Sequence, residues 1–203
     1  DVNAGKVRAF AEALADYPAE LVDRLLTHHK AHGGVSRYAK FEWFFTELMP
    51  VLDARERIQE ALDRYGIASR AAYATLFPRP EALAFAARMG GPERVWVVSG
   101  SDQAELREVF ADHEIAGRFA GILGSPMTKM EHARALIEAS DVDPSRVLVV
   151  GDGRAEFEAA QELGMAFVFL EEMSEWSGAH TALQGKPGVA TCATWADLLG
   201  RIA

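Results

Sequence analysis

The segment RVLVVGDGRAEFEAAQELGMAFVFL, residues 146–170, decides the fold class. Its apolar run over 147–150 predicts a strand, and the amphipathic stretch over 155–163 predicts a helix that ends at Leu163–Gly164, a good C-terminal stop. A second apolar run over 166–169 predicts another strand. A strand, a helix and a strand in this order are typical of a parallel sheet whose strands are joined by crossover helices.

The same alternation extends over residues 78–203, which we assign to one α/β domain. In open α/β sheets, ligands bind beyond the carboxyl ends of the strands. A functional site is therefore expected in the loops after Val98, Leu123 and Val150. The remaining elements expected here are strands over 95–98 and 119–123, helices over 80–89, 103–113 and 129–139, and a closing helix that begins at Trp195.

Residues 1–77 follow a different pattern, which predicts a helical domain. Apolar residues recur at helical spacing, as at Val7, Phe10 and Leu14, and almost nothing in this half is typical of a strand. The stiff segment FPRP, residues 77–80, cannot continue a helix and marks the domain boundary. Breaks between helices are expected at Tyr17–Pro18, at Gly33–Gly34 with Ser36 as an N-cap, and at Met49–Pro50.

Composition limits the class of protein. The 203 residues are 49% apolar and 25% charged, close to the about 45–50% and about 25% of soluble globular proteins. The longest apolar runs fall far short of the about 20 residues that a membrane span needs. The formal net charge is -9 and no run of Lys or Arg occurs, so neither nucleic acid nor a membrane is an expected partner. One cysteine, Cys192, and a start unlike a signal peptide predict a cytoplasmic location.

The loop VVSGSD, residues 97–102, is the first candidate binding loop. Asp102 and Glu105 form a pair like a capping box, which leaves the Ser99 hydroxyl without a capping role. A free hydroxyl followed by the backbone amide of Gly100 suits a phosphoryl oxygen. The alternative is an ordinary turn between a strand and a helix.

The loop LGSPMTK, residues 123–129, is the second candidate. Thr128 and Glu131 form a capping box that places Lys129 in the first turn of the next helix. The helix dipole disfavours a cation there by up to about 1 kcal/mol. This conflict points to a bound anion, and the alternative is a lysine in solvent.

The loop VVGDGRAE, residues 149–156, is the third candidate. Asp152 and Glu156 could hold a hard cation such as Mg²⁺ through oxygen ligands. Alternatively, both acids only complement the dipole of the helix that begins there. Nucleotide binding is a weaker interpretation, because Gly151-Asp-Gly153 lacks the third glycine of the dinucleotide motif.

In this order the three loops resemble the haloacid dehalogenase-like (HAD) superfamily of phosphohydrolases, in particular members with an inserted helical cap. Ser99 matches the Ser or Thr of motif II, Lys129 the lysine of motif III, and Asp152 the first acid of motif IV. The segment GGVSRYAKF, residues 33–41, is similar to the cap of a phosphoglycolate-phosphatase-like branch. The resemblance implies an α/β fold: a Rossmann-like HAD core with a parallel sheet over 78–203, and an α-helical cap domain over 1–77.

The resemblance also implies a function, a Mg²⁺-dependent phosphatase of a small phosphorylated metabolite such as phosphoglycolate or a sugar phosphate. Ser99, Lys129 and Asp152 would be catalytic, Gly100 would bind the phosphoryl group, and Asp152 and Glu156 would hold the metal. Glu156 stands where the family usually has Asp, and its side chain is longer by one methylene. Motif I, which supplies the aspartate that forms the aspartyl-phosphate and also a central strand, is expected upstream of residue 1. A non-catalytic phosphate-binding relative and a phosphomutase are the alternatives.

Substrate choice is expected in the helical domain, because the core loops can address only the phosphoryl group. Arg37 and Lys40 follow the flexible Gly33–Gly34 turn and could meet an anionic substrate. Alternatively, both are solvent-exposed helix charges. His28, His29 and His32 include an i, i+4 pair, but they lack a clear third metal ligand and are interpreted as a solvated helix face.

Overall fold

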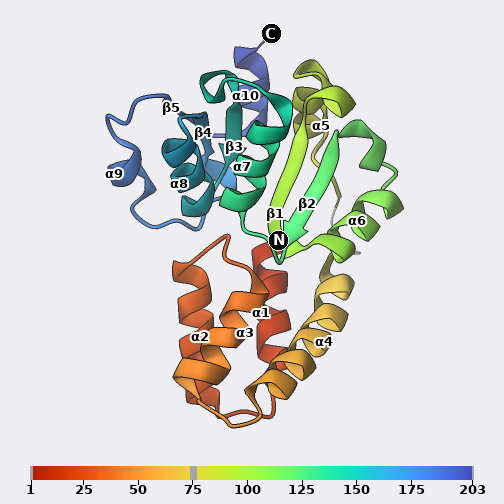
Figure 1. Ribbon diagram of the computed structural model, residues 1–203, viewed down its shortest axis with the longest axis vertical. Helices are drawn as coiled ribbons and strands as arrows, with labels where there is room; N and C mark the ends of the chain where they lie inside the picture. The colour runs from red at the N-terminus through yellow and green to blue at the C-terminus, as the bar shows by residue number, and fades with distance from the viewer. Residues whose placement is uncertain (1, 74–76, 203) are drawn as a thin grey trace.

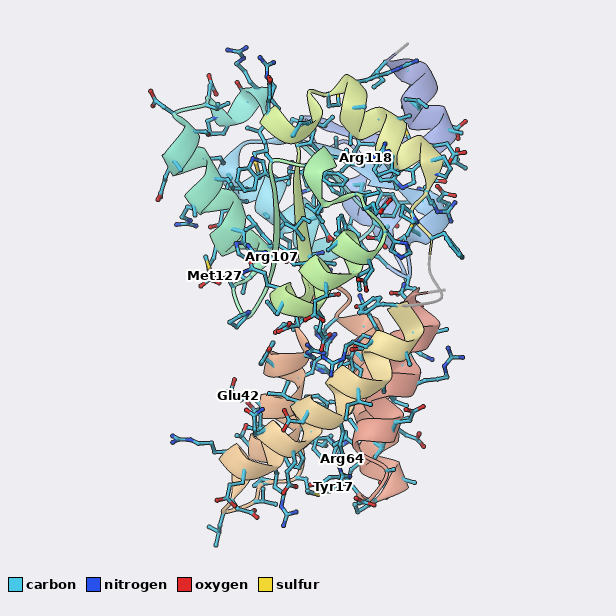
Figure 2. The ribbon with its side chains drawn as sticks, turned by 90° about the vertical axis from the view of Figure 1, so that its right-hand side faces the viewer. Tyr17, Glu42, Arg64, Arg107, Arg118 and Met127 are labelled. Carbon is cyan, nitrogen blue, oxygen red and sulfur yellow. The ribbon has the colours of Figure 1, made fainter. Side chains whose placement is uncertain are left out.

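The computed structural model describes residues 2–73 and 77–202, which form two parts stacked end to end (Figure 1). Residues 2–73 make the helical part and residues 77–202 the α/β part. The start of the chain lies where the two parts meet (Figure 1). Figure 2 shows Tyr17 and Arg64 at the end of the helical part that lies farthest from the α/β part.

The helical part is a bundle whose aromatic core lies between its helices. It consists of α1 (Val2–Ala13), α2 (Ala19–Ala31), α3 (Arg37–Trp43), a π-helical turn (Phe44–Leu48) and α4 (Ala54–Tyr73). Phe10, Phe41, Phe44 and Phe45 are almost completely buried in this core. The three breaks expected from the sequence are confirmed, and the Ser36 hydroxyl accepts a hydrogen bond from the Ala39 N–H at 3.3 Å as the N-cap of α3.

The α/β part alternates strands and helices, and all of its strand pairs are parallel. Two of its elements, the short helix α9 (Ala179–Leu183) and the last strand β5 (Val189–Cys192), were not predicted from the sequence. The elements are α5 (Pro80–Arg88), β1 (Trp96–Asp102), α6 (Gln103–Asp112), β2 (Gly121–Ser125), α7 (Lys129–Ser140), β3 (Leu148–Gly151), α8 (Arg154–Leu163), β4 (Ala166–Leu170), α9 (Ala179–Leu183), β5 (Val189–Cys192) and α10 (Trp195–Arg201).

The strands form two separate groups. β1 pairs with β2, and β3, β4 and β5 form a second sheet, while no pairing joins β1 to β3 in the described part of the chain. Across Figure 1 the strands follow the order β5, β4, β3, β1, β2, so β1 and β3 are the inner strands. Both are only partly buried, whereas Phe167–Leu170 of β4 are buried. The strands at the centre of the order are therefore more exposed than β4 beside them.

Two expectations about boundaries have different outcomes. α8 begins at Arg154 and ends at Leu163, and Gly164 takes the left-handed conformation as its C-cap, as the sequence predicts. The domain boundary near residue 77 stays a prediction, because residues 74–76 lie outside the described residues. None of the described helices combines the length and the apolar composition that crossing a bilayer requires.

Candidate active site at the junction of the two parts

The three predicted loops meet around Gly34, in the turn between α2 and α3. A Cβ at Gly34 would lie 3.2 Å from the Cβ of Ala155 and 3.4 Å from Nζ of Lys129. A Cβ at Gly100 would lie only 2.5 Å from the carbonyl oxygen of Gly34, so Gly100 has no space for a side chain. The loops after β1, β2 and β3 therefore come together beneath one turn of the helical part.

Hydrogen bonds fix the loop after β1. The Ser99 hydroxyl accepts the Ser101 N–H at 3.1 Å, which leaves its proton available to another acceptor. The Ser125 hydroxyl donates to the Gly100 carbonyl at 2.7 Å and ties the ends of β1 and β2 together. Asp102 accepts the Glu105 N–H at 3.0 Å as the N-cap of α6. The Asp102 cap is confirmed, but the Glu105 carboxylate does not complete a capping box, because it binds Arg37.

Lys129 forms an ion pair with Glu156 and joins the second loop to the third. The capping box of Thr128 and Glu131 is present, and Lys129 is the first residue of α7 as predicted. Its ammonium group binds Oε1 of Glu156, and both side chains are 13% exposed. The interpretation of Lys129 as a lysine in solvent is therefore wrong. The Glu156 carboxylate offsets the unfavourable helix dipole at Lys129.

Two glycines let Glu156 reach back over its own loop. A Cβ at Gly151 would lie 2.7 Å from Cγ of Glu156, and a Cβ at Gly153 would lie 2.8 Å from its Oε2. Because neither glycine has a side chain, the loop has room for the Glu156 side chain, which is one methylene longer than that of an aspartate. The backbone carbonyl of Asp152 accepts a hydrogen bond from the Ser174 hydroxyl at 2.6 Å, which holds the loop in place.

The acids of this loop fit one side of a magnesium site. Burial raises the pKa of Asp152, the charge of Glu156 raises it further, and Lys129 opposes both. Oε2 of Glu156 is buried and has no hydrogen-bond partner among the described residues. Mg²⁺ is usually bound through one or two carboxylates, together with waters and substrate phosphate. Within residues 2–73 and 77–202, no three His, Cys, Asp or Glu side chains form a complete metal site.

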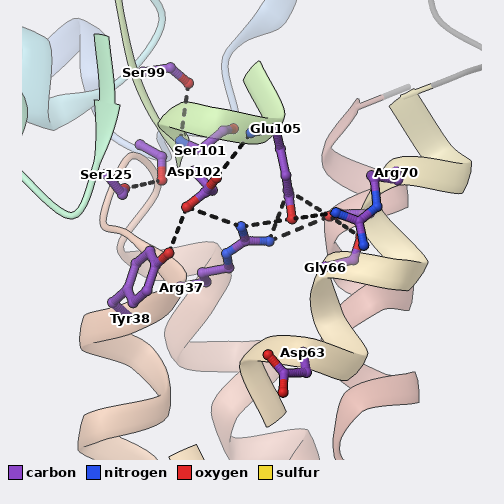
Figure 3. Close-up of polar contacts among 12 residues, drawn as sticks. Arg37, Tyr38, Asp63, Gly66, Arg70, Ser99, Ser101, Asp102, Glu105 and Ser125 are labelled. Carbon is purple, nitrogen blue, oxygen red and sulfur yellow. Dashed lines mark hydrogen bonds and ion pairs between the residues drawn. The ribbon is translucent and has the colours of Figure 1, made fainter. Parts of the chain in front are cut away.

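Arg37 connects the helical part to the α/β part through a buried ion pair (Figure 3). Its guanidinium donates a hydrogen bond from Nη1 to Oε2 of Glu105 at 3.0 Å, and Nη2 forms an ion pair with Oε1 at 2.9 Å. Ser69 donates to the same carboxylate at 3.0 Å, and the Tyr38 hydroxyl donates to Asp102 at 2.6 Å. A substrate contact for Arg37 stays a prediction; its polar contacts are with Glu105 and Asp102 of the α/β part and with Ser69 of the helical part.

Lys40 lies inside the helical part rather than in solvent. Its side chain is 1% exposed, and its Nζ lies 2.7 Å from Nδ1 of His29, which is also buried. Burial, followed by the charges of Lys6 and Lys129, lowers the pKa of Lys40 to about 7. The alternative of solvent-exposed helix charges is wrong for Arg37, at 7% exposure, and for Lys40.

The histidines of α2 point in different directions. His28 stacks between His32 and Trp43, with ring centroids 4.0 and 4.2 Å apart. His29 faces the core, so the solvated face predicted for the three histidines is wrong at this position. Nothing in the sequence singled out Ser69, and Glu105 was named only as a capping partner of Asp102, because Ser69 and Arg37, which bind the Glu105 carboxylate, are distant from it along the chain. The separation of Arg37 and Glu105, for example, is 68 positions.

A sequence model of the haloacid dehalogenase-like hydrolases matches residues 3–164 of the chain. This chain belongs to the haloacid dehalogenase-like hydrolase family. The family membership inferred from the three loops is thus confirmed, and the match spans the helical part and the three loops of the haloacid dehalogenase-like site. No curated protein matches the chain.

Solved structures share the fold of this haloacid dehalogenase-like chain. A predicted phosphoglycolate phosphatase from Haemophilus somnus matches at a TM-score of 0.69 and 16% identity, over 99% of this chain and 92% of its own. CbbY from Rhodobacter sphaeroides, in complex with phosphate, matches at a TM-score of 0.68 and 16% identity, over 98% of this chain and 90% of its own. A protein described as a β-phosphoglucomutase from Thermotoga maritima matches at a TM-score of 0.61 and 15% identity, over 97% of this chain and 90% of its own. At such identities the likeness shows the fold alone, which is the predicted parallel α/β core with its helical cap.

We expect Lys129→Met to weaken binding of orthovanadate about tenfold or more, because the cation is lost from the loops that meet at Gly34. It should also destabilise the fold by up to about 3 kcal/mol, since the partly buried Glu156 carboxylate loses its partner. The double variant Lys129→Met with Glu156→Gln should regain the stability but not the vanadate affinity. Calorimetric titration and thermal unfolding measure the two effects. Unaltered vanadate binding in Lys129→Met would assign the lysine a purely structural role.

Proposed function

We propose that this haloacid dehalogenase-like protein is a Mg²⁺-dependent phosphatase of small phosphorylated metabolites, such as phosphoglycolate or sugar phosphates. The observation that carries the proposal is the grouping of one cation, two carboxylates and a serine hydroxyl at the ends of three parallel strands. Lys129, Asp152, Glu156 and Ser99 are the groups concerned, and the Gly34 turn lies against Lys129, Glu156 and Gly100. Such a set can hold a phosphoryl group and a divalent cation side by side.

Each residue has a role that follows from its charge and position. Lys129 and the free proton of the Ser99 hydroxyl would bind the phosphoryl oxygens, with the Gly100 turn close to them. Asp152 and Glu156 would hold Mg²⁺, which when bound supplies positive charge that neutralises phosphoryl oxygens. The unpartnered Oε2 of Glu156 and the raised pKa of Asp152 are both features that a bound cation would relieve.

The nucleophilic aspartate is proposed to lie upstream of residue 1, on a strand that pairs between β1 and β3. Among the residues that the structure describes, β1 and β3 each have an unpaired inner edge, and both are less buried than β4. A parallel strand placed there would carry its carboxyl end to the same edge as Ser99, Lys129 and Asp152. Attack by its aspartate on phosphorus would give an aspartyl-phosphate and release the alcohol.

The substrate class rests on the proposed division into a cap, residues 1–77, and a core, residues 78–203. The cap turn at Gly34 and the residues after it cover the phosphoryl site, so the cap would select the rest of the substrate. A second structure of CbbY from Rhodobacter sphaeroides holds xylulose-(1,5)bisphosphate, which supports a small phosphorylated substrate. A cytoplasmic location fits the single buried cysteine, Cys192.

The test is phosphate release from a panel of phosphate monoesters by the protein encoded by its full gene. We expect turnover with Mg²⁺ that stops when EDTA is added. Transfer of phosphate between two positions of one sugar, without net release, would indicate a phosphomutase. Binding of inorganic phosphate without turnover of any ester would support the non-catalytic alternative and contradict the proposal.

A further inference from the structure

A buried histidine of α7 contacts the main chain at the end of β2. The His132 side chain is 5% exposed, and its Nε2 lies 2.9 Å from the carbonyl oxygen of Gly124. A carbonyl oxygen can only accept a hydrogen bond, so Nε2 carries a proton and donates it. This hydrogen bond joins the start of α7 to the end of β2, on either side of the loop that leads to Lys129.

The same glycine is also held by the loop after β1. The Gly124 N–H donates to Oε1 of Gln103, the first residue of α6, at 3.2 Å. A Cβ at Gly124 would lie 2.5 Å from the carbonyl oxygen of Ser101 and 2.8 Å from Cα of Gln103, so the two main chains lie directly against each other. Gly124 is therefore fixed through its N–H by Gln103 and through its carbonyl by His132.

His132 anchors the helix face that carries Lys129. The two residues lie three positions apart in the first turn of α7, so their side chains are neighbours on the helix surface. The His132 N–H donates to the carbonyl of Thr128, the N-cap, at 3.0 Å. A shift of α7 along its axis, or a rotation about it, would break the hydrogen bond to Gly124. The anchor therefore fixes the base of the Lys129 side chain relative to the loops after β1 and β2.

The start of α7 needs such an anchor because other forces act on Lys129. The helix dipole disfavours an ammonium group in the first turn, and Glu156 draws it toward the loop after β3. When a phosphoryl group binds, the same ammonium group would be shared between Glu156 and the phosphoryl oxygens. A helix start that stays in place keeps the ammonium group at one position in both states, so the site needs no rearrangement when the anion arrives.

We propose that His132 and Gln103 are positioning residues for Lys129, and that they act by fixing Gly124 between the loop after β1 and the first turn of α7. The inference rests on the part of the proposed function that assigns Lys129 to the phosphoryl oxygens. Neither side chain would touch the substrate. Both would hold the cation in its binding position, and a binding group that is held loosely loses affinity even though it is present.

The test is the binding of orthovanadate to two variants of His132 that carry the same amide at different reach. The amide nitrogen of Gln stands about as far from the backbone as Nε2 of His, whereas that of Asn is too close to reach Gly124. We expect His132→Asn to weaken vanadate binding by about threefold to tenfold, and His132→Gln to restore most of the affinity. Calorimetric titration measures the affinity, and thermal unfolding checks the fold. The control is His180→Asn, at an exposed histidine of α9, which should bind vanadate as wild type does.

A double-mutant cycle separates positioning of Lys129 from a general structural role. In the Lys129→Met background, His132→Asn should cause no further loss of vanadate affinity, because the group that His132 positions is absent. An equal loss in both backgrounds, or an unchanged affinity in His132→Asn, would overturn the role of His132. Gln103 is only partly buried, so Gln103→Leu keeps the test decisive if His132→Asn does not fold. It should lose vanadate affinity only when Lys129 is present, and any other result would contradict the fixing of Gly124.

Vanadate binding does not require turnover, so this test is independent of the phosphatase assay. If no ester is hydrolysed but the cycle shows coupling between His132 and Lys129, the proposed function fails and the positioning role holds. If esters are hydrolysed but the cycle shows no coupling, the positioning role fails and the proposed function holds. If the wild-type protein binds no vanadate, the anion site at Lys129 is wrong and the inference falls with it.

Discussion

Asp152→Asn is expected to reduce phosphate release by about a hundredfold to a thousandfold, the effect of losing one group that stabilises charge in the transition state. Asn keeps the size of the side chain but not the negative charge that would hold Mg²⁺. Steady-state assays over a series of Mg²⁺ concentrations measure the loss. Asp143→Asn, at an exposed acid that caps a short helix, is the matched control and should behave as wild type.

The same substitution should stabilise the protein in the absence of metal. Burial and Glu156 raise the pKa of Asp152, so folding disfavours its ionised form. The resulting destabilisation is present above the folded-state pKa and is relieved as the pH falls through that value. Thermal unfolding in EDTA should therefore give a higher Tm for Asp152→Asn than for wild type at neutral pH. Wild-type turnover by Asp152→Asn, with and without chelator, would contradict the metal assignment.

Arg37→Met is expected to destabilise the fold by about 3–5 kcal/mol, because the buried Glu105 carboxylate loses its ionic partner. Arg37 and Glu105 are 7% and 6% exposed, and one hydrogen bond and one further ion-pair contact join them across the junction. The double variant Arg37→Met with Glu105→Leu should recover most of the loss, since no charge is then left unpaired. Urea unfolding of the two single variants and the double variant measures the coupling.

The control is the ion pair of Arg64 and Asp16, at the far end of the helical part (Figure 2). Its atoms are 2.6 Å apart, but the two side chains are 48% and 71% exposed, and solvent screens such pairs strongly. Arg64→Met should therefore cause no measurable loss of stability. Equal losses for Arg37→Met and Arg64→Met would show that burial does not strengthen the junction pair.

Local patterns in the sequence predicted the elements that have strong periodicity or clear ends. The helical part, the four strands β1 to β4, and the caps at Ser36, Thr128 and Gly164 follow from residues close together in the chain. β5 was missed, because it is a run of only four residues, VATC, with exposed Ala190 and Thr191. α9 has only five residues, which is too short for a periodic signal.

On the core side the candidate site was predicted from the loops, whereas on the side of the helical part only Arg37 and Lys40 were named, as substrate-binding residues whose partners were not foreseen. Each core loop follows a recognisable strand, so Ser99, Lys129, Asp152 and Glu156 could be named from their positions alone. The contacts of the helical part depend on tertiary packing, which no local pattern encodes. Glu105 at the start of a helix is typical of a capping residue, and Lys6 and Lys40 are typical of a solvated helix face. The packing of α3 and α4 against the α/β part changes the interpretation of Glu105. Contacts among the helices of the helical part, such as that of Lys40 with His29, change the interpretation of Lys40.

The contact between Gly34 and Gly100 would determine how closely the proposed cap approaches the core loops. The Gly34 carbonyl occupies the space where a Cβ of Gly100 would stand, so the two parts meet there through main-chain atoms. The methyl group of a Gly100→Ala variant would clash with the Gly34 carbonyl oxygen and would push the two parts apart at this contact. The substitution would leave every acidic and basic side chain of the site unchanged. If the helical part is a cap as proposed, the side chains around this contact could change to suit another substrate while the spacing of the two main chains stayed constant.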